Sequence, residues 1–319
     1  MQKSLSAILF AIGYFIFLSV KGQEKIIVID NPKNKTLIQI NLADSQKLNT
    51  QKKTLIIFFA LPNGNSIEWT KGKLMQAGDD WHYDIQHIAA QTRYVRQVMD
   101  DHTIIIVYMA NYQKSWPAWK KQRSDAPQEI KRIVDSVTSM FSAYRPEIML
   151  NSHSGGGSFI FGYLDAVEQI PGHVRRIAFI DSDYGYEDSL HSGKLIHWLK
   201  SSKQHYLNVL AYNDSVVIYN GKPLVSSTGG TWYRSKMMQR KLSEAFRFSY
   251  LEDTNFIHFS GLSNRIDILL KINQKGKIYH TEQVVRNGFI HTVLSGTKYE
   301  KKASYQYWGK RVYGEFIRP

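Results

Sequence analysis

The residues best suited to chemistry lie at positions 147–157, which read Glu-Ile-Met-Leu-Asn-Ser-His-Ser-Gly-Gly-Gly. An apolar run ends at Asn151, Ser154 follows in a glycine-rich turn, and Ser158 begins a segment with a helical pattern. A serine hydroxyl is a weak nucleophile, so a fold must present it where a base can reach it. A strand, a sharp turn and a helix in this order do so. The sequence therefore predicts that Ser154 is a nucleophile.

Two segments offer backbone N–H groups for a developing oxyanion. Gly155 follows the serine at the start of the expected helix, where the helix dipole adds a partial positive charge. The loop after the third expected strand contains Asn63 and Gly64, the best candidates for a second donor. The same Pro-Asn-Gly residues also suit a plain tight turn, so both interpretations stay open here.

The turn from Ser152 to Gly156 resembles the nucleophile elbow of the α/β-hydrolase family of serine hydrolases and esterases, which usually reads Gly-x-Ser-x-Gly. Ser152 replaces the first glycine, and its Cβ crowds a strained turn. The resemblance implies a mostly parallel, eight-stranded sheet with helices on both faces. It also implies an aspartate and a histidine that follow the serine in that order.

Three aspartates compete for the acidic position. Asp214 ends the segment at 207–214, which begins with the expected seventh strand, and is the expected acid. Asp181 and Asp183 end the sixth strand and are the alternatives. The acid would accept a hydrogen bond from the histidine and stabilise its imidazolium form.

Three histidines compete for the role of base. His291 follows the last expected strand, after a glycine and two apolar residues, and is the expected base. His258 precedes that strand, and His280 lies in an alternating segment that suits a surface strand. Either rival also suits a purely structural role.

Apolar, β-branched runs alternate with helical patterns along the chain. Eight runs predict strands, at 26–29, 37–40, 55–59, 104–108, 148–150, 177–180, 207–210 and 266–270. Helical stripes follow at 81–98, from 125 to 141, and at 191–200. Most of the strands are continuously apolar, which favours a parallel sheet buried on both faces. The connection after the sixth strand is too short for a large lid.

Composition favours one exported domain. The chain has 319 residues and 43% hydrophobic residues, enough for a sizeable core, and has no linker or repeat. Lys3 and an apolar stretch at 5–20 predict a signal peptide over residues 1–22, with a membrane anchor as the alternative. The remaining 23–319 then form a single domain. With no cysteine, and so no disulfide framework, we expect a secreted or periplasmic protein without stable membrane insertion.

Several ligand classes are disfavoured. The formal net charge is +14, but the basic residues are dispersed and no nucleic-acid motif is present, so we expect no nucleic-acid partner. The segment 79–87 looks rich in metal ligands, yet His82 and His87 are five apart and do not share a helix face, so we expect no metal. The implied acyl-transfer chemistry needs no cofactor.

Aromatic residues in the loops at 116–121, 184–186 and 231–234 suggest the kind of substrate. They favour a small-molecule or glycan ester, such as an acyl group on a sugar, although core packing explains such residues equally well. Two alternatives are carried: a secreted serine peptidase of the same fold, and a non-catalytic glycan-binding protein. The sequence does not indicate an oligomeric state.

Overall fold

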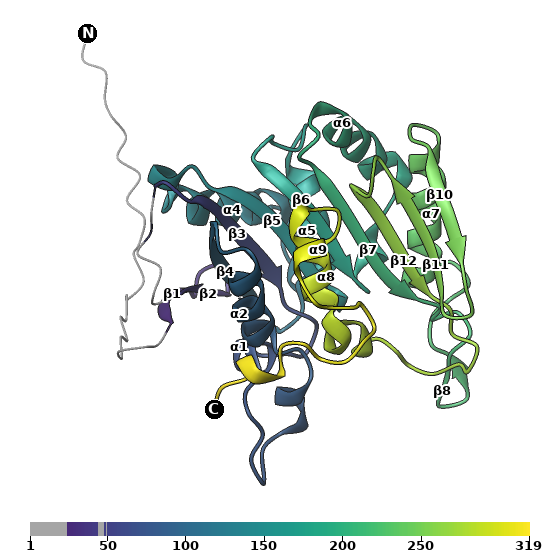
Figure 1. Ribbon diagram of the computed structural model, residues 1–319, viewed down its shortest axis with the longest axis horizontal. Coiled ribbons are helices and arrows are strands. Elements are labelled where there is room, and N and C mark those ends of the chain that lie inside the picture. Colours follow the sequence, from purple (N-terminus) through teal and green to yellow (C-terminus); the bar gives the residue numbers. More distant parts are fainter. Residues whose placement is uncertain (1–23, 44–47, 49) are drawn as a thin grey trace.

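A twisted sheet runs through the middle of the molecule, with helices on both faces (Figure 1). The computed structural model describes residues 24–43, 48 and 50–319, so the predicted signal peptide lies outside the described residues. The sheet has ten strands in the order β1-β2-β4-β3-β5-β6-β7-β12-β11-β10.

Parallel pairing joins β4, β3, β5, β6, β7 and β12, and the outer strands are antiparallel. All eight predicted strands are present, and two more, β10 and β11, extend the sheet beyond the last parallel strand. The sheet is therefore the expected one with an added antiparallel edge. The strands are β1 (Lys25–Asn31), β2 (Thr36–Leu42), β3 (Lys53–Ala60), β4 (His102–Asn111), β5 (Glu147–His153), β6 (Val174–Ile180), β7 (Tyr206–Tyr212), β10 (Phe248–Glu252), β11 (Phe256–Gly261) and β12 (Ile266–Lys271), with a short separate hairpin of β8 (Ile218–Tyr219) and β9 (Lys222–Pro223).

Successive side chains of a strand point to opposite faces, so each face of the sheet has its own apolar core. One core lies under α3 (Trp116–Lys121), α4 (Ala126–Ser139), α5 (Gly157–Ala166), α6 (Gly193–Ser201) and α7 (Thr231–Ser243). The other lies under α1 (Ile67–Lys71), α2 (Ile88–Val98), α8 (Phe289–Leu294) and α9 (Lys298–Lys302). We call these the α5 face and the α8 face; the helices of the α8 face are in front in Figure 1.

The predicted helix at 81–98 is interrupted. A 3₁₀ turn covers Trp81–Asp84, and α2 begins only at Ile88. His87 lies between them with a left-handed φ of 47°. Its buried ring forms a hydrogen bond from Nε2 to Asp84 Oδ1 across 2.8 Å. The backbone of Gly72 approaches this ring so closely that a Cβ there would lie 2.4 Å from His87 Nδ1. The packing of His87 therefore overrides the helical pattern.

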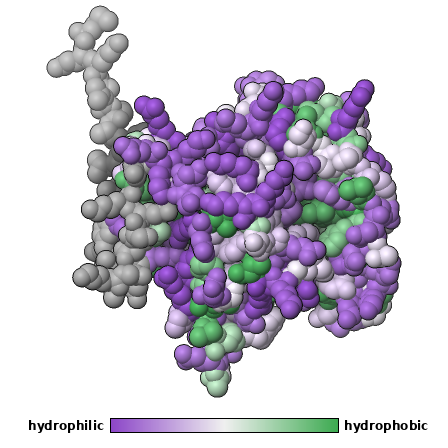
Figure 2. All heavy atoms as spheres, in the orientation of Figure 1, coloured by the Kyte–Doolittle hydropathy of each residue, from purple (hydrophilic) through white to green (hydrophobic). Residues whose placement is uncertain are grey.

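The exterior of the protein is mostly hydrophilic. Hydrophilic side chains predominate on the face seen in Figure 2, and apolar ones form scattered patches. Within the described ranges, no helix is both long and apolar enough to cross a membrane.

Candidate active site

Ser154 sits at the sharpest point of a strand-turn-helix unit. β5 ends at His153, a single 3₁₀ turn covers Ser154–Gly156, and α5 begins at Gly157. Ser154 has a φ of 57°, in the left-handed region that L-residues rarely occupy. Such backbone strain persists only where surrounding structure enforces it, and it is concentrated at functional sites. The hydroxyl is thereby lifted above the end of the strand.

The departure from glycine at Ser152 is accommodated inside the sheet. Ser152 is the penultimate residue of β5 and is fully buried. Its hydroxyl lies 2.7 Å from the Ser182 hydroxyl, and Ser182 Oγ also donates to the Ser152 carbonyl across 3.2 Å. The serine at this position thus ties the end of β5 to the segment after β6.

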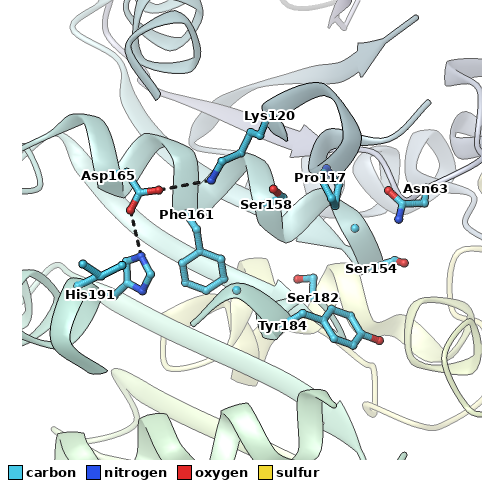
Figure 3. A pocket seen from close by; sticks show the side chains of 13 residues that line it. Asn63, Pro117, Lys120, Ser154, Ser158, Phe161, Asp165, Ser182, Tyr184 and His191 are labelled. Carbon is cyan, nitrogen blue, oxygen red and sulfur yellow. Dashed lines mark hydrogen bonds and ion pairs between the residues drawn. The ribbon is translucent and has the colours of Figure 1, made fainter. Parts of the chain in front are cut away.

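The glycines after Ser154 permit close approach on two sides. A Cβ on Gly157 would lie 1.6 Å from the Ser182 carbonyl oxygen, and one on Gly155 would lie 2.1 Å from Asn63 Oδ1. The side chain of Asn63 therefore packs directly over the turn, beside Ser154 (Figure 3).

Two of the three predicted oxyanion donors remain suited to that role. Gly155 is in the first turn of the helical segment, where N–H groups lack an intrahelical acceptor. Asn63 lines the same cavity as Ser154 and offers its side-chain amide. Gly64 differs, because its N–H donates to the Lys114 carbonyl across 2.8 Å. That bond occupies the Gly64 donor, so the geometry favours Gly155 and Asn63.

His280, the rival histidine of the alternating segment, reaches the end of the parallel strands. It lies in the connection after β12, in a turn and not a strand. Its Nδ1 forms a short hydrogen bond with Asp181 Oδ2. Asp181 directly follows β6, and Ser154 directly follows β5; the last paired residues of these two strands are Ile180 and His153. Adjacent strands lie about 4.8 Å apart, so the backbone of Asp181, which carries the His280 contact, is about one strand spacing from that of Ser154.

His153 holds the backbone of His280 in place. The two imidazole centroids are 4.6 Å apart, and His153 Nε2 donates to the His280 carbonyl across 3.1 Å. Burial lowers the pKa of His153 well below its ordinary value, with the neighbouring His280 adding to the effect. His153 is therefore a neutral positioning residue between the elbow and the His280 turn.

Thr231 links the two carboxylates that compete for the acidic position. Its hydroxyl donates to Asp181 Oδ1 in a short hydrogen bond, and its backbone N–H donates to Asp214 Oδ2 across 2.9 Å. Asp214 is buried, and Asp181 has no exposed surface. Of the two, Asp181 is the one whose carboxylate contacts an imidazole.

Burial raises the pKa values of the carboxyl groups of Asp214 and Asp183 by different amounts. It raises the pKa of Asp214 to about 6 and that of Asp183 to about 8, and the charge of Asp181 contributes to both shifts. Asp183 Oδ2 accepts a hydrogen bond from Ser235 Oγ across 2.8 Å. At neutral pH Asp183 is therefore mainly protonated, and it is unsuited to stabilising an imidazolium.

A cavity of about 570 Å³ opens beside Ser154 on the α5 face. Ser154, Gly155 and Asn63 form one end, and a polar group of Lys120, Asp165 and His191 lies at the other, with Phe161 between them (Figure 3). The remaining lining residues are Pro117, Ser158, Ser182, Tyr184, Gly185 and Leu190. The volume suits a small-molecule site.

The candidate site residues follow the strands in the order expected for this fold. The elbow follows β5, Asp181 follows β6, Asp214 follows β7, and His280 follows β12, the last parallel strand. The chain has the α/β-hydrolase fold. The predicted fold class is thus confirmed, including helices on both faces of the sheet. No family model matches the sequence, and no curated protein does either.

Solved structures resemble this chain at low sequence identity. A thermostable esterase is 13% identical with a TM-score of 0.48, covering 88% of this chain and 63% of its own. An IroE-like serine hydrolase from Shewanella oneidensis is 11% identical with a TM-score of 0.46, covering 85% and 79%. A feruloyl esterase module from Clostridium thermocellum is 12% identical with a TM-score of 0.44, covering 89% and 87%.

The structure does not bring His291 to Ser154. His291 is buried in α8, where its Nε2 lies 2.9 Å from Asp267 Oδ2 and its Nδ1 lies 3.1 Å from the Tyr305 hydroxyl. Both ring nitrogens are thereby engaged. His258 bonds to the other oxygen of Asp267 across 2.8 Å. These residues form a polar cluster in which Asp267 and His291 are buried and His258 is partly exposed, with the Ser295 hydroxyl also donating to Asp267.

The position of Asp267 in the sheet separates this cluster from the elbow. Asp267 pairs with Asn208, and further pairing continues that row through Ala178 to Asn151, three residues before Ser154. The cluster is therefore three strand spacings from β5, roughly 14 Å. Strand order admitted either His280 or His291, and only contact with Asp181 distinguishes them.

Most of the aromatic residues expected at the site wall belong to the core. Trp116, Trp119 and Tyr186 are buried on the α5 face, and Trp232 packs against the same core. Tyr184 alone of the residues in those three predicted loops is an aromatic lining the cavity in the described structure. The core explanation is therefore the better one for the tryptophans.

Segment 79–87 makes local polar contacts. His82 Nδ1 pairs with Asp80, while His87 Nε2 pairs with Asp84. Among the residues that the structure describes, no group of three or more side chains of the metal-binding types is gathered closely enough to hold an ion.

Proposed function

We propose that this protein is a serine hydrolase that cleaves carboxylic esters through an acyl-enzyme on Ser154. The observation that carries the proposal is the strained Ser154 at the end of β5, next to the His280–Asp181 pair at the end of β6. Nucleophile, base and orienting carboxylate are thereby supplied by adjacent elements, as acyl transfer requires.

The tautomer of His280 suits a general base. An ionised carboxylate only accepts hydrogen bonds, so the bond to Asp181 places the His280 proton on Nδ1. Nε2 then has a free lone pair. The Ser154 hydroxyl has no hydrogen-bond partner among the described residues, and such contacts often tighten only when substrate is bound.

The reaction proceeds in two balanced halves. His280 Nε2 removes the Ser154 proton while Oγ attacks the ester carbonyl, and the N–H groups of Gly155 and Asn63 stabilise the oxyanion. The tetrahedral intermediate expels the alcohol oxygen, which takes the proton from His280. Water then attacks the acyl-enzyme with His280 again as base, releasing the acid and restoring Ser154.

The acid is Asp181 in this proposal, in place of Asp214. Asp181 contacts His280, and Asp214 supports it through Thr231. The histidine is His280 in place of His291, whose two nitrogens are engaged by Asp267 and Tyr305.

Export is a separate proposal that rests on Lys3 and the apolar stretch at 5–20. It agrees with a cysteine-free chain that relies on its core and not on disulfides. Mass spectrometry of the mature N-terminus after expression with the full leader tests it, since cleavage near Gly22 is expected.

Turnover of 4-nitrophenyl esters by the purified protein tests the proposed activity, with Ser154→Ala as control. We expect release of nitrophenol that Ser154→Ala abolishes. Equal turnover by Ser154→Ala would overturn the triad. Faster cleavage of matched anilides would instead indicate the peptidase alternative, and retention of glycans without any turnover would indicate the binding protein.

A further inference from the structure

The cavity beside Ser154 lies on one side of the nucleophile and His280 on the other. Phe161 of α5 and Lys120 of α3 line the cavity, and both helices cover the α5 face. Asn151, two residues before His153 on the same side of β5, bonds to Thr292 of α8 across 2.8 Å. His153 and His280, whose rings are tilted toward each other with centroids 4.6 Å apart, are therefore on the α8 side.

If the protein has the proposed function, this arrangement indicates where the acyl half and the alcohol half of an ester substrate bind. The general acid must reach the leaving oxygen, so the alcohol lies beside His280. His280 does not line the cavity, whereas Ser154, Gly155 and Asn63 do. The cavity is therefore the acyl site, and its volume of about 570 Å³ is far larger than an acetyl group requires.

The far end of the cavity has defined hydrogen-bonding properties. The Glu187 backbone N–H donates to His191 Nδ1 across 2.9 Å, so the His191 proton is on Nε2 and is donated to Asp165 Oδ1 across 3.2 Å. Lys120 Nζ lies 3.4 Å from Asp165 Oδ2. Asp165 is the one hydrogen-bond partner of Lys120 Nζ among the described residues, so this ammonium has donors to spare.

We propose that this far end recognises a distal hydroxyl on an elongated, otherwise apolar acyl group. Lys120 can only donate and Asp165 can only accept, and a hydroxyl does both. A distal carboxylate would meet Asp165, whose charge balances that of Lys120. The walls between the two ends are mainly apolar, with Pro117, Phe161 and Leu190, although Ser158, Ser182 and Tyr184 also line the cavity.

Matched substrates test the proposal directly. The 4-nitrophenyl esters of ω-hydroxy, unsubstituted and ω-carboxy straight-chain acids share one leaving group, and chain lengths of four, six and eight carbons allow the distal group to reach the pair. We expect kcat/KM for the best ω-hydroxy ester to exceed that of its unsubstituted counterpart about five- to tenfold. The ω-carboxy ester should be the poorest.

Two variants identify the residues responsible. Lys120→Met should reduce the hydroxyl preference to about twofold or less, whereas Lys121→Met, an exposed neighbour on α3, should leave it unchanged. Asp165→Asn should instead raise kcat/KM for the ω-carboxy ester, because it leaves Lys120 without its counter-charge. The latter is a gain, so it cannot arise from misfolding.

The outcomes separate this proposal from the proposed function. Turnover of all esters without a hydroxyl preference, or an equal loss of preference in Lys121→Met, would overturn the acyl-site assignment and leave the hydrolase intact. Preference for the ω-carboxy ester in the wild type would overturn it as well. If the folded wild type turned over none of the esters, so that its rates equalled those of Ser154→Ala, the proposed hydrolase activity itself would be refuted.

Discussion

His280 Nδ1 forms a short hydrogen bond with Asp181, which directly follows β6 as Ser154 directly follows the neighbouring strand β5. The imidazole comes from a connection almost a hundred residues later in the chain, after β12. Its turn is held by the hydrogen bond from His153, the residue before the nucleophile. The elbow thus fixes both the serine and the histidine expected to activate it.

Replacing each of the two aspartates by asparagine should affect kcat unequally. Asp181→Asn is expected to lower kcat about 10³- to 10⁴-fold, because it removes the charge that fixes the His280 tautomer. Asp214→Asn should cost less than about tenfold, since an amide oxygen can still accept the Thr231 N–H bond. Steady-state kinetics of both variants checks the ranking, and the reverse order would return the acid to the end of β7.

The two candidate bases should differ in their effect on activity. His280→Ala should lower kcat about 10⁴-fold or more, and it should also lower the free energy of unfolding because buried Asp181 loses a hydrogen-bond donor. His291→Ala should retain turnover but lower the free energy of unfolding by about 2 kcal/mol or more, because buried Asp267 loses a hydrogen-bond donor. Kinetics and urea unfolding of each variant provide the comparison; loss of activity in His291→Ala alone would contradict our assignment.

The side chain of Asn63 should contribute to oxyanion stabilisation. Asn63→Ala is expected to lower kcat about 10²-fold with little change in KM, since the interaction strengthens in the transition state. Asn65→Ala, in the same loop, is the matched control and should leave kcat unchanged. A kcat unaffected in Asn63→Ala would show that its backbone, or another group, supplies the second donor.

Asp183 should make the protein less stable at alkaline pH. Its pKa is raised to about 8 by burial, above the ordinary value of 3.8. The folded form therefore retains a proton that the unfolded chain loses, so stability falls as pH rises from about 4 to about 8. Asp183→Asn, which keeps an acceptor for Ser235, should flatten this fall. Thermal unfolding between pH 5 and 9 measures it, and equal slopes for the two proteins would refute the assignment.

Ser152→Gly should test whether the unusual first elbow residue matters. The change restores the glycine usual in α/β-hydrolases but removes the hydroxyl bond to Ser182. We expect kcat to change less than about threefold. The melting temperature should fall, because a buried hydrogen bond is lost and glycine gives the unfolded chain more conformational entropy. A large gain in kcat would show that Ser152 strains the elbow unproductively.

Continuous apolar runs and the serine turn were sufficient to predict the fold. The strands at 55–59, 104–108 and 148–150 are buried on both faces, and such strands are recognisable by composition alone. The strands β10 and β11 were missed because they are mostly exposed or half-buried at the edge, so burial does not impose an apolar pattern on them.

The partners of the serine were harder to predict because chain order constrains elements and not contacts. His280 and His291 both follow β12. The apolar residues around His291 suggested a segment leading into a site, but they belong to α8 and pack in the core. Asp181 and Asp214 likewise end adjacent strands. A close three-dimensional contact, the short bond from His280 to Asp181, separates the alternatives.

Labelling with a fluorophosphonate shows whether Ser154 is an activated nucleophile and which histidine activates it, because the probe reacts only with an activated serine. The wild type, Ser154→Ala, His280→Ala and His291→Ala are labelled under identical conditions, and the modified peptide is identified by mass spectrometry. We predict labelling at Ser154 in the wild type and in His291→Ala, and none at that position in Ser154→Ala or His280→Ala. Undiminished labelling of His280→Ala, with loss in a folded His291→Ala, would contradict the account.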